Sequence, residues 1–248
     1  MHIQSHSNHP CVVCDSPYVL HVNSVECQPN SIEEKVDIFF CMNCESCQSP
    51  NAEPKVNGGG ALSWHKKVLA RNLGWSRELI DLLVKKNYLK SHIVDIGCGS
   101  GALLAAGREL GIQGIGFDTD VEAVEFFRRE LSVDLRGETW SPTKTAESKF
   151  DLITSISLLE HLHFPGQLIK EMSDAAKEKS ANIFVSVPLF NKNKWSRMWE
   201  IGYPPGPPAD THVTHFSDKG LITAFRKNGA THFEKLTAGG WIGFIIQF

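Results

Sequence analysis

The sequence predicts an α/β fold with a doubly wound, mostly parallel sheet and a small metal-binding unit ahead of it. Strand-like apolar runs alternate with segments of helical periodicity between residues 92 and 187. The first run leads directly into the glycine-rich turn Gly97-Cys98-Gly99-Ser100-Gly101. Two Cys-x2-Cys pairs lie in the first fifth of the chain. A glycine turn at the carboxyl end of a first strand is typical of Rossmann-like sheets.

Each expected strand is a short apolar run between turn residues, and each expected helix carries apolar residues at helical spacing. We predict strands at residues 92–95, 114–117, 133–135, 150–155 and 182–187. We predict helices at residues 102–110, 121–131, 165–177 and 218–228. Two β-rich runs, 231–236 and 241–248, fit a closing antiparallel hairpin at one edge of the sheet.

The length of 248 residues fits one full α/β domain with a small appendage. Residues 1–50 form the expected appendage, because both cysteine pairs lie within them. Strand-like runs at 18–25 and 36–40 fill the space between the pairs. This layout is that of a zinc ribbon.

Residues 51–61 contain Pro54 and three consecutive glycines, which predicts a linker. The main domain is then expected at 62–248. It begins with apolar residues at helical spacing up to Tyr88, which predicts one or two helices with Gly74 as the break.

The charge and hydropathy of the chain disfavour several classes of partner. A formal net charge of -3 gives no general attraction to a polyanion, so nucleic acid is disfavoured and a small-molecule acceptor is expected. No apolar run approaches the roughly 20 residues that cross a bilayer, so we expect no membrane span. The first ten residues have no secretory-signal pattern, so we expect a cytoplasmic protein. The oligomeric state is left open.

The cysteines favour metal binding over disulfides, because their number is odd and no signal peptide is evident. Two pairs separated by 26 residues could hold one structural Zn²⁺ through four thiolates. The expected ligands are Cys11, Cys14, Cys41 and Cys44. A Cys44/Cys47 pair and His9 are alternative ligands, and reduced thiols without metal are a further alternative.

Asp15 and Glu45 follow the two cysteine pairs, at positions where such turns usually have glycine. We expect both residues to adopt a left-handed conformation, at a modest cost in free energy.

The glycine turn needs residues without a Cβ, because a Cβ would block the turn and the approach of backbone N–H groups to a ligand. Its spacing is G-x-G-x-G, whereas dinucleotide enzymes usually have G-x-G-x-x-G. Asp95 lies beside the turn. Its carboxylate would repel a pyrophosphate but suits the cationic amino and sulfonium groups of S-adenosylmethionine. The sequence therefore favours that cofactor.

Asp118 ends the second strand, about 20 residues beyond the glycines, where an acidic residue usually accepts hydrogen bonds from ribose hydroxyls. The ordered pair of glycine turn and acid is more specific than a glycine pattern alone.

Three segments resemble one family. They are VDIGCGSG (94–101) with GIGFDTD (114–120), then FDLI (150–153) leading to LEHL (159–162), and finally VPLF (187–190) with HVTHFS (212–217). The run from about 94 to 217 resembles the class I S-adenosylmethionine methyltransferases. Within them it is similar to the small-molecule branch of quinone O-methyltransferases and zinc-carrying sugar C-methyltransferases.

The resemblance implies a set of cofactor-binding residues. Those around the methionine and ribose are Asp95, Gly97, Cys98, Gly99, Gly101, Asp118 and Thr119, and those near the adenine or after the fourth strand are Glu138, Thr139, Ser155 and Ser157. It also implies an aromatic cover from the leading helix, for which Trp64 is the candidate. The ribbon of the sugar enzymes resembles Cys41 to Pro50, which places ligands at Cys41 and Cys44 and leaves Cys47 spare.

The implied activity is methyl transfer to an oxygen or carbon atom of a small metabolite, such as a sugar, a quinone-like compound or a natural product. Only removal of a proton demands a catalytic side chain, and neutral histidine suits that step near pH 7. The candidates are His161, His212 and His215, and Glu160 is expected as a structural hydrogen-bond partner. Two alternatives are a methyltransferase acting on RNA or protein, and a non-catalytic cofactor-binding or scaffold protein.

Overall fold

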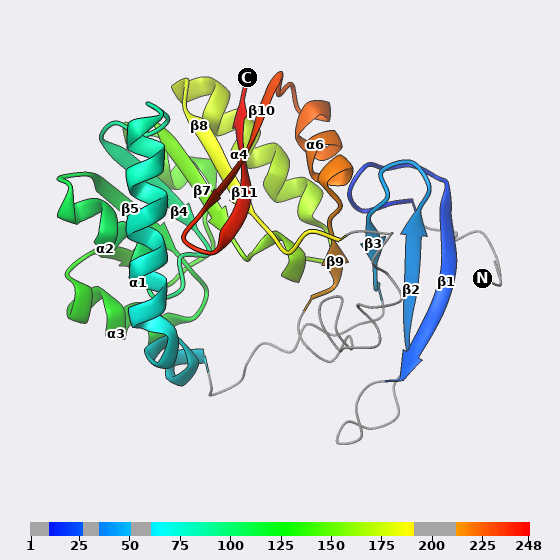
Figure 1. Ribbon diagram of the computed structural model, residues 1–248, viewed down its shortest axis with the longest axis horizontal. Helices are drawn as coiled ribbons and strands as arrows, with labels where there is room; N and C mark the ends of the chain where they lie inside the picture. The colour runs from blue at the N-terminus through cyan, green and yellow to red at the C-terminus, as the bar shows by residue number, and fades with distance from the viewer. Residues whose placement is uncertain (1–9, 27–34, 51–60, 191–211) are drawn as a thin grey trace. The chain divides into compact units, whose positions relative to one another are not determined.

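A computed structural model describes residues 10–26, 35–50, 61–190 and 212–248 of the chain (Figure 1). The chain divides into two compact units. One draws on residues 1–56, 159–169 and 187–228, and the other on residues 57–158, 170–186 and 229–248. Each unit has its own sheet.

The second of these units is built on a seven-stranded sheet with the order β10-β11-β8-β7-β4-β5-β6. Its parallel strands are β4 (His92–Ile96), β5 (Gln113–Phe117), β6 (Asp134–Arg136), β7 (Leu152–Ile156) and β8 (Asn182–Ser186). The antiparallel hairpin of β10 (His232–Ala238) and β11 (Trp241–Gln247) closes one edge. The strand order reverses between β4 and β7, which creates a ligand-binding switch point at the carboxyl end of β4.

The strands form where the sequence predicts them, with bounds that differ by a few residues. The central strands β4 and β7 are buried over almost their whole length, as expected of parallel strands covered on both faces. This explains why their sequences are continuous apolar runs rather than alternating ones.

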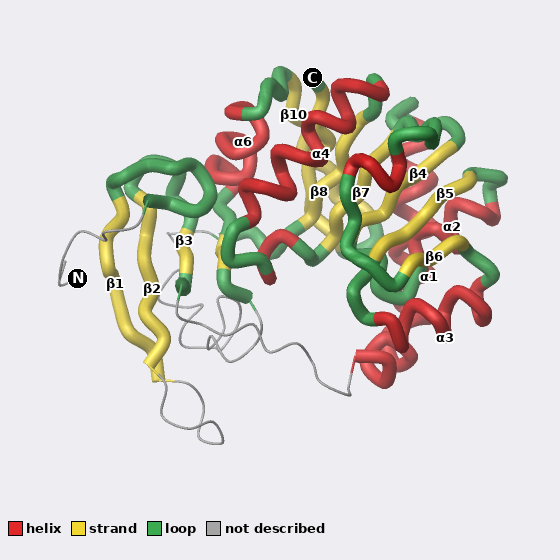
Figure 2. The backbone as a smooth tube through the Cα atoms, turned by 180° about the vertical axis from the view of Figure 1, so that it is seen from behind, coloured by secondary structure: helices red, strands yellow, loops and turns green. Residues whose placement is uncertain are grey.

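Helix α1 (Ala61–Lys85) packs against α2 (Ala102–Glu109) and α3 (Val121–Leu131), and α2 and α3 pack on the parallel strands. Helix α1 lies in front of the sheet in Figure 1, whereas α4 (Pro165–Lys179) lies in front of it in Figure 2, seen from behind. The sheet is therefore covered on both faces.

Helix α1 is continuous through Gly74, so the predicted break there is wrong. The buried residues Leu79, Ile80 and Leu83 anchor its second half in the core. That burial outweighs the cost of about 1 kcal/mol for a glycine in a helix. The same core contains Phe127 of α3 and other large side chains from the sheet.

The first unit contains a four-stranded sheet with the order β1-β2-β3-β9. Strands β1 (Val19–Glu26) and β2 (Lys35–Cys41) form the predicted antiparallel pair, followed by the short β3 (Cys47–Gln48). The edge strand β9 (Thr214–His215) comes from far along the chain and was not predicted. It leads into helix α6 (Asp218–Lys227).

The predicted boundaries at residues 50 and 62 stay a prediction. The expected linker at 51–61 lies outside the described residues except for Ala61, which begins α1. Among the helices in the described part of the chain, none is both long and apolar enough to cross a bilayer.

Candidate active site

The glycine turn follows β4 in the tight conformation that its sequence predicts. Gly97, Gly99 and Gly101 have φ angles of 76°, 50° and 69°, the left-handed region that only glycine adopts easily. The N–H groups of Gly97 and Cys98 donate to the carbonyl oxygen of Phe117, at 2.8 and 3.1 Å. The turn is thereby fastened to the end of β5, and α2 begins immediately after it.

Asp118 connects this turn to the start of α3. Its carboxylate accepts a hydrogen bond from the N–H of Gly99 at 2.9 Å and another from the N–H of Asp120 at 3.0 Å. An ionised carboxylate has about four acceptor sites, so further hydroxyl groups can still be bound. Its place at the carboxyl end of β5 suits the predicted contact with a ribose.

Asp95 lies at the base of the turn and is only 4% exposed. Its carboxylate accepts a hydrogen bond of 2.6 Å from the hydroxyl of Thr154. Burial raises the pKa of Asp95 to about 7, although the bond from Thr154 acts in the opposite direction. A cationic ligand at this place would favour the ionised carboxylate, and an anionic one would oppose it.

His65 of α1 lies against the glycine turn. A Cβ at Gly99 would come within 2.6 Å of Cε1 of His65, so the imidazole occupies the space that the glycine leaves. The His65 Nδ1 is buried without a hydrogen-bond partner among the described residues, and burial lowers the pKa of this histidine. Trp64 is 50% exposed.

Cys98, Ser155 and Ser157 border the same switch point. The side chain of Cys98 packs on Gly116, where a Cβ would lie 2.8 Å from its sulfur. Ser155 is buried, and its hydroxyl has no partner in the part of the chain that the structure describes. Ser157 has a φ angle of 53°, and its N–H donates to Ser186 at 2.8 Å.

The predicted adenine segment lies on the surface after β6. Glu138 and Thr139 are exposed, and Glu138 forms an ion pair of 2.7 Å with Lys144. Thr119, after β5, is exposed as well. Trp140, in contrast, is 3% exposed and donates its indole N–H to Thr145.

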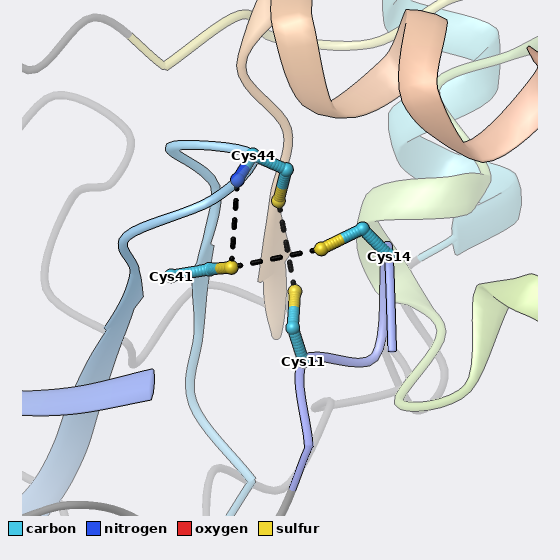
Figure 3. Close-up of side chains that lie close together, drawn as sticks. All are labelled: Cys11, Cys14, Cys41 and Cys44. Carbon is cyan, nitrogen blue, oxygen red and sulfur yellow. Dashed lines mark hydrogen bonds between the residues drawn. The ribbon is translucent and has the colours of Figure 1, made fainter. Parts of the chain in front are cut away.

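Four buried cysteines converge in the first unit (Figure 3). Sulfur-to-sulfur distances are 3.6 Å for Cys11 to Cys44 and 3.6 Å for Cys14 to Cys41, and all four sulfurs lie within 4.8 Å of one another. A tetrahedral Zn²⁺ with bonds near 2.3 Å requires sulfurs roughly 3.8 Å apart. The cluster therefore fits a four-thiolate metal site.

The turns that present these cysteines have matching backbone geometry. Asp15 donates to the carbonyl of Cys11 at 2.8 Å, and Glu45 donates to that of Cys41 at 2.9 Å. Asp15 and Glu45 have φ angles of 58° and 61°, as the missing glycines predict. Both residues adopt this conformation despite its cost in free energy, because each turn must present two sulfurs.

Cys47 is not part of the cluster, which weighs against the alternative Cys44/Cys47 pair. It lies in β3, packed with Ile38 and Phe190, and burial raises the pKa of its thiol. The other alternative ligand, His9, lies outside the described residues.

A second cluster forms where the turn at 159–161 meets the segment before β9. Nε2 of His161 lies 4.0 Å from a carboxylate oxygen of Glu160, and the rings of His161 and His212 are 4.8 Å apart. The N–H of Val213 donates to the carbonyl of Glu160 at 2.9 Å, which joins the two segments. Two of the three predicted catalytic histidines are thus brought together.

The third histidine, His215, lies in β9 and is 6% exposed. Burial and the neighbouring His212 lower the pKa of His215 to about 3, and burial lowers that of His212 to about 4. Both imidazoles are therefore neutral at physiological pH.

The sequence missed His65 and underrated Glu160. His65 directly follows Trp64 in α1, and the expected aromatic cover by Trp64 stays a prediction. Glu160, expected to be a hydrogen-bond partner, has both carboxylate oxygens buried without a hydrogen bond to any described residue. The environment of Glu160 becomes visible only when the turn at 159–161 pairs with the segment around residue 212.

A family model described as a methyltransferase domain matches residues 69–234. The ribosomal protein L11 methyltransferase of Thermotoga neapolitana is 31% identical over 114 residues, which cover 44% of this chain and 42% of that protein. The ubiquinone biosynthesis O-methyltransferase of Stutzerimonas stutzeri (strain A1501) is 28% identical over 121 residues, covering 46% and 50%.

Among solved structures, an O-methyltransferase family protein from Burkholderia thailandensis has a TM-score of 0.56 at 11% identity, covering 75% of this chain and 56% of its own. That likeness shows the fold. The chain spans about half the length of the curated relatives that it matches.

Proposed function

The chain belongs to the methyltransferase domain family, and from this premise we propose that it transfers the methyl group of S-adenosylmethionine to a small metabolite. The acceptor atom is an oxygen or a carbon, of a sugar, a quinone-like compound or a natural product. The relatives named as ubiquinone biosynthesis O-methyltransferases support an acceptor of this size.

The observation that carries the proposal is the pair of carboxylates beside the glycine turn. Asp95 is buried at its base, and Asp118 bonds directly to Gly99 within it. The buried carboxylate of Asp95 disfavours a pyrophosphate there and suits the amino and sulfonium groups of S-adenosylmethionine, whereas Asp118 suits its ribose hydroxyls. The left-handed glycines give the cofactor access to the backbone.

The remaining predicted cofactor residues have defined parts in this proposal. Ser155, near the end of β7, and Ser157, just after it, contact the cofactor from the neighbouring strand. Glu138 and Thr139 flank the adenine, with Thr119 next to the ribose. The buried, unpartnered hydroxyl of Ser155 supports its assignment, because a ligand would satisfy it.

For the acceptor we propose the cluster of Glu160, His161 and His212 as the chemical group that takes up its proton. His161 is the better base of the two imidazoles, since its side chain is 33% exposed. His215 is too buried to meet an acceptor, so its role is to support β9. Methyl transfer itself is an in-line displacement that depends mainly on positioning.

We further propose that Cys11, Cys14, Cys41 and Cys44 hold a structural Zn²⁺. An all-thiolate site with four protein ligands has no open position for chemistry. A cluster of reduced thiols also fits the expected cytoplasmic location.

The cofactor assignment is tested by calorimetric titration with S-adenosylhomocysteine and, separately, with NAD⁺. We expect saturable binding of S-adenosylhomocysteine, none of NAD⁺, and a loss of roughly tenfold or more in affinity for Asp118→Asn. Glu130→Gln, on the exposed side of α3, is the control that should leave binding unchanged. Preference for NAD⁺ would refute the assignment.

A protein acceptor is the second candidate, because one relative at 31% identity is named as a ribosomal protein methyltransferase. The N-terminal ribbon segment is only weakly basic, so it offers little positive charge for binding RNA. Analysis of where a labelled methyl group arrives distinguishes these candidates.

A further inference from the structure

We propose that Thr154 is a positioning residue for the cofactor: its hydroxyl holds the carboxylate of Asp95 in one orientation and stabilises the negative charge that meets the cationic end of S-adenosylmethionine. The inference rests on the proposed function, which assigns this cofactor and places Asp95 beside it. In this account Thr154 does not touch the ligand and acts through Asp95.

The two residues are direct partners in neighbouring strands of the larger sheet. Asp95 of β4 is in register with Thr154 of β7. Side chains alternate between the faces of a sheet, and paired residues of parallel strands point to the same face. Thr154 is fully buried, and Asp95 is 4% exposed. The contact is therefore fixed by the backbones of two central strands.

The hydroxyl of Thr154 is directed at Asp95 rather than at the backbone. Its oxygen lies 2.6 Å from Oδ1 of Asp95 but 3.5 Å from the carbonyl oxygen of Val94. The shorter length is typical of a bond from a hydroxyl to an ionised carboxylate. The bond occupies Oδ1, so Oδ2 is the oxygen that can meet a ligand.

The other neighbour of Asp95 in the sheet cannot take this part. Gly116 of β5 is in register with Asp95 on the opposite side from Thr154, and it has no side chain that could donate. A Cβ at Gly116 would lie 2.8 Å from Sγ of Cys98, so the side chain of Cys98 fills the space beside it. Of the two residues that flank Asp95, only Thr154 can stabilise its charge through a side chain.

The buried setting disfavours the charge on Asp95. Burial raises its pKa to about 7, the hydrogen bond from Thr154 lowers it, and the negative charge of Asp118 at the end of β5 raises it. Of these three influences, only the hydrogen bond favours the ionised form that suits a cationic ligand. Loss of the hydroxyl should therefore leave a larger share of Asp95 protonated near neutral pH.

The other described elements around Asp95 supply no positive charge that could replace this bond. Burial raises the pKa of the Cys98 thiol in the glycine turn, which keeps the thiol neutral. Burial lowers the pKa of His65 of α1, which favours its neutral form. Residues 102–107 of α2 are buried alanine, leucine and glycine. The cationic partner of Asp95 is thus left to the ligand.

The test is calorimetric titration with S-adenosylhomocysteine, using the full-length wild type, Thr154→Val and Thr154→Ser. Valine has the shape of threonine without the hydroxyl, whereas serine keeps the hydroxyl. At about pH 6, Thr154→Val should bind about tenfold more weakly than the wild type, because loss of a hydrogen bond to a charged group raises the pKa of Asp95 by about 1. At about pH 8.5 the difference should shrink to less than about twofold. Thr154→Ser should follow the wild type throughout.

A second ligand separates this role from a structural one. 5′-Methylthioadenosine has the adenosine and sulfur of the cofactor but no amino acid group, so it presents no ammonium to Asp95. Thr154→Val should bind it as tightly as the wild type at every pH. A general weakening of the fold would lower the affinity for both ligands alike.

The Asp95→Asn background tests whether Thr154 acts through Asp95. Here Thr154→Val should cause no further loss of affinity for S-adenosylhomocysteine, because the charge that it stabilises is absent. Thr154→Ala replaces Thr154→Val in every measurement if the valine variant does not fold.

Three results would overturn the inference: a loss of affinity in Thr154→Val that is the same at both ends of the pH range, an equal loss for both ligands, or a further loss in the Asp95→Asn background. No binding of S-adenosylhomocysteine by the wild type would instead remove the proposed function.

Urea unfolding reports on the pair of residues even without a ligand. Since the folded-state pKa of Asp95 lies above its ordinary value, its contribution to stability is lost as the pH rises. In Thr154→Val this loss should extend to higher pH than in the wild type. An identical pH dependence of the two proteins would show that Thr154 does not stabilise the charge of Asp95.

Discussion

The hydroxyl of Ser217 caps the first turn of helix α6, by accepting the N–H of Gly220 at 2.8 Å, and at the same time donates to the backbone carbonyl of Cys44. The N–H of Ser217 donates to the hydroxyl of Ser46 at 3.1 Å. A Cβ at Gly220 would lie 2.0 Å from that hydroxyl, so the helix start is fitted closely to the second cysteine turn.

The same contact continues along the chain. After the cysteine turn, β3 pairs with β9, and the N–H of Ser49 donates to the carbonyl of Val213 at 2.9 Å. Val213 in turn donates to Glu160. A continuous set of backbone hydrogen bonds therefore connects the four-cysteine cluster to the cluster of Glu160, His161 and His212.

Removal of the proposed Zn²⁺ from the cysteine cluster should loosen the second cluster as well. A structural zinc site supplies folding free energy, and its loss frees the turn that holds Ser217 and β9. Hydrogen–deuterium exchange should show faster exchange of the amides at 212–220 after chelation. Amides of α2 serve as the internal control, and equal protection at 212–220 with and without metal would contradict this account.

The ligand set of the cysteine cluster can be tested with two serine variants. Cys44→Ser should lose most of its zinc, because it removes one of four thiolates. Cys47→Ser should keep a full equivalent, since Cys47 is outside the cluster. Metal content measured after dialysis distinguishes the two possible ligand sets. Zinc loss in Cys47→Ser would support the alternative Cys44/Cys47 pair.

Gly99→Ala should weaken binding of S-adenosylhomocysteine by about tenfold or more. The added Cβ meets the imidazole of His65 at 2.6 Å, in addition to the strain of a φ angle of 50°. Gly111→Ala is the matched control: its φ angle is 76°, but no atom lies within 4 Å of the added Cβ. The backbone strain should cost each variant about 1–2 kcal/mol of stability, and the clash should cost Gly99→Ala more. Only Gly99→Ala should lose affinity.

His65→Ala provides a second step for this test. If the imidazole causes the clash, His65→Ala combined with Gly99→Ala should recover part of the lost affinity. Strictly additive effects of the two substitutions would show that His65 does not act through Gly99.

Asp95→Asn should change the pH dependence of stability. The folded-state pKa of about 7 lies above the ordinary value of 3.8, so the ionised form is disfavoured by folding. The contribution of Asp95 to the stability of the wild type is therefore largest below pH 3.8 and is lost as the pH rises from there through about 7. The full effect is about 4 kcal/mol as an upper estimate.

Urea unfolding at about pH 4.5 and about pH 8 measures this difference. The asparagine variant, which has no charge to bury, should gain stability relative to the wild type at the higher pH. It should also bind S-adenosylhomocysteine more weakly, because the carboxylate that faces the cation is lost. A constant stability difference across the pH range would mean that Asp95 is not desolvated as described.

Much of the larger sheet could be predicted because its features are local. Apolar runs, helical periodicity and the glycine turn predict strands and helices from short stretches of sequence. Glycine at positions 97, 99 and 101 indicates the left-handed conformation that these residues adopt. The cysteine turns could be predicted in the same way, including the left-handed conformation of Asp15 and Glu45.

The second cluster could not be predicted in the same way, because it depends on pairing between distant segments. No local signal brings residue 212 to Glu160 or β9 to β3, and a two-residue strand has no pattern of its own. The absence of a hydrogen-bond partner for Glu160 is likewise a property of tertiary packing. Gly74 failed as a helix break because packing of α1 outweighs a local preference.

The most direct test of the central claim is incubation of the full-length protein with methyl-labelled S-adenosylmethionine and a fractionated metabolite extract. The account predicts label in a low-molecular-mass fraction, and its loss in the Asp118→Asn variant but not in Glu130→Gln. Label that appears only in protein or RNA, or no transfer to any fraction despite bound cofactor, would contradict it.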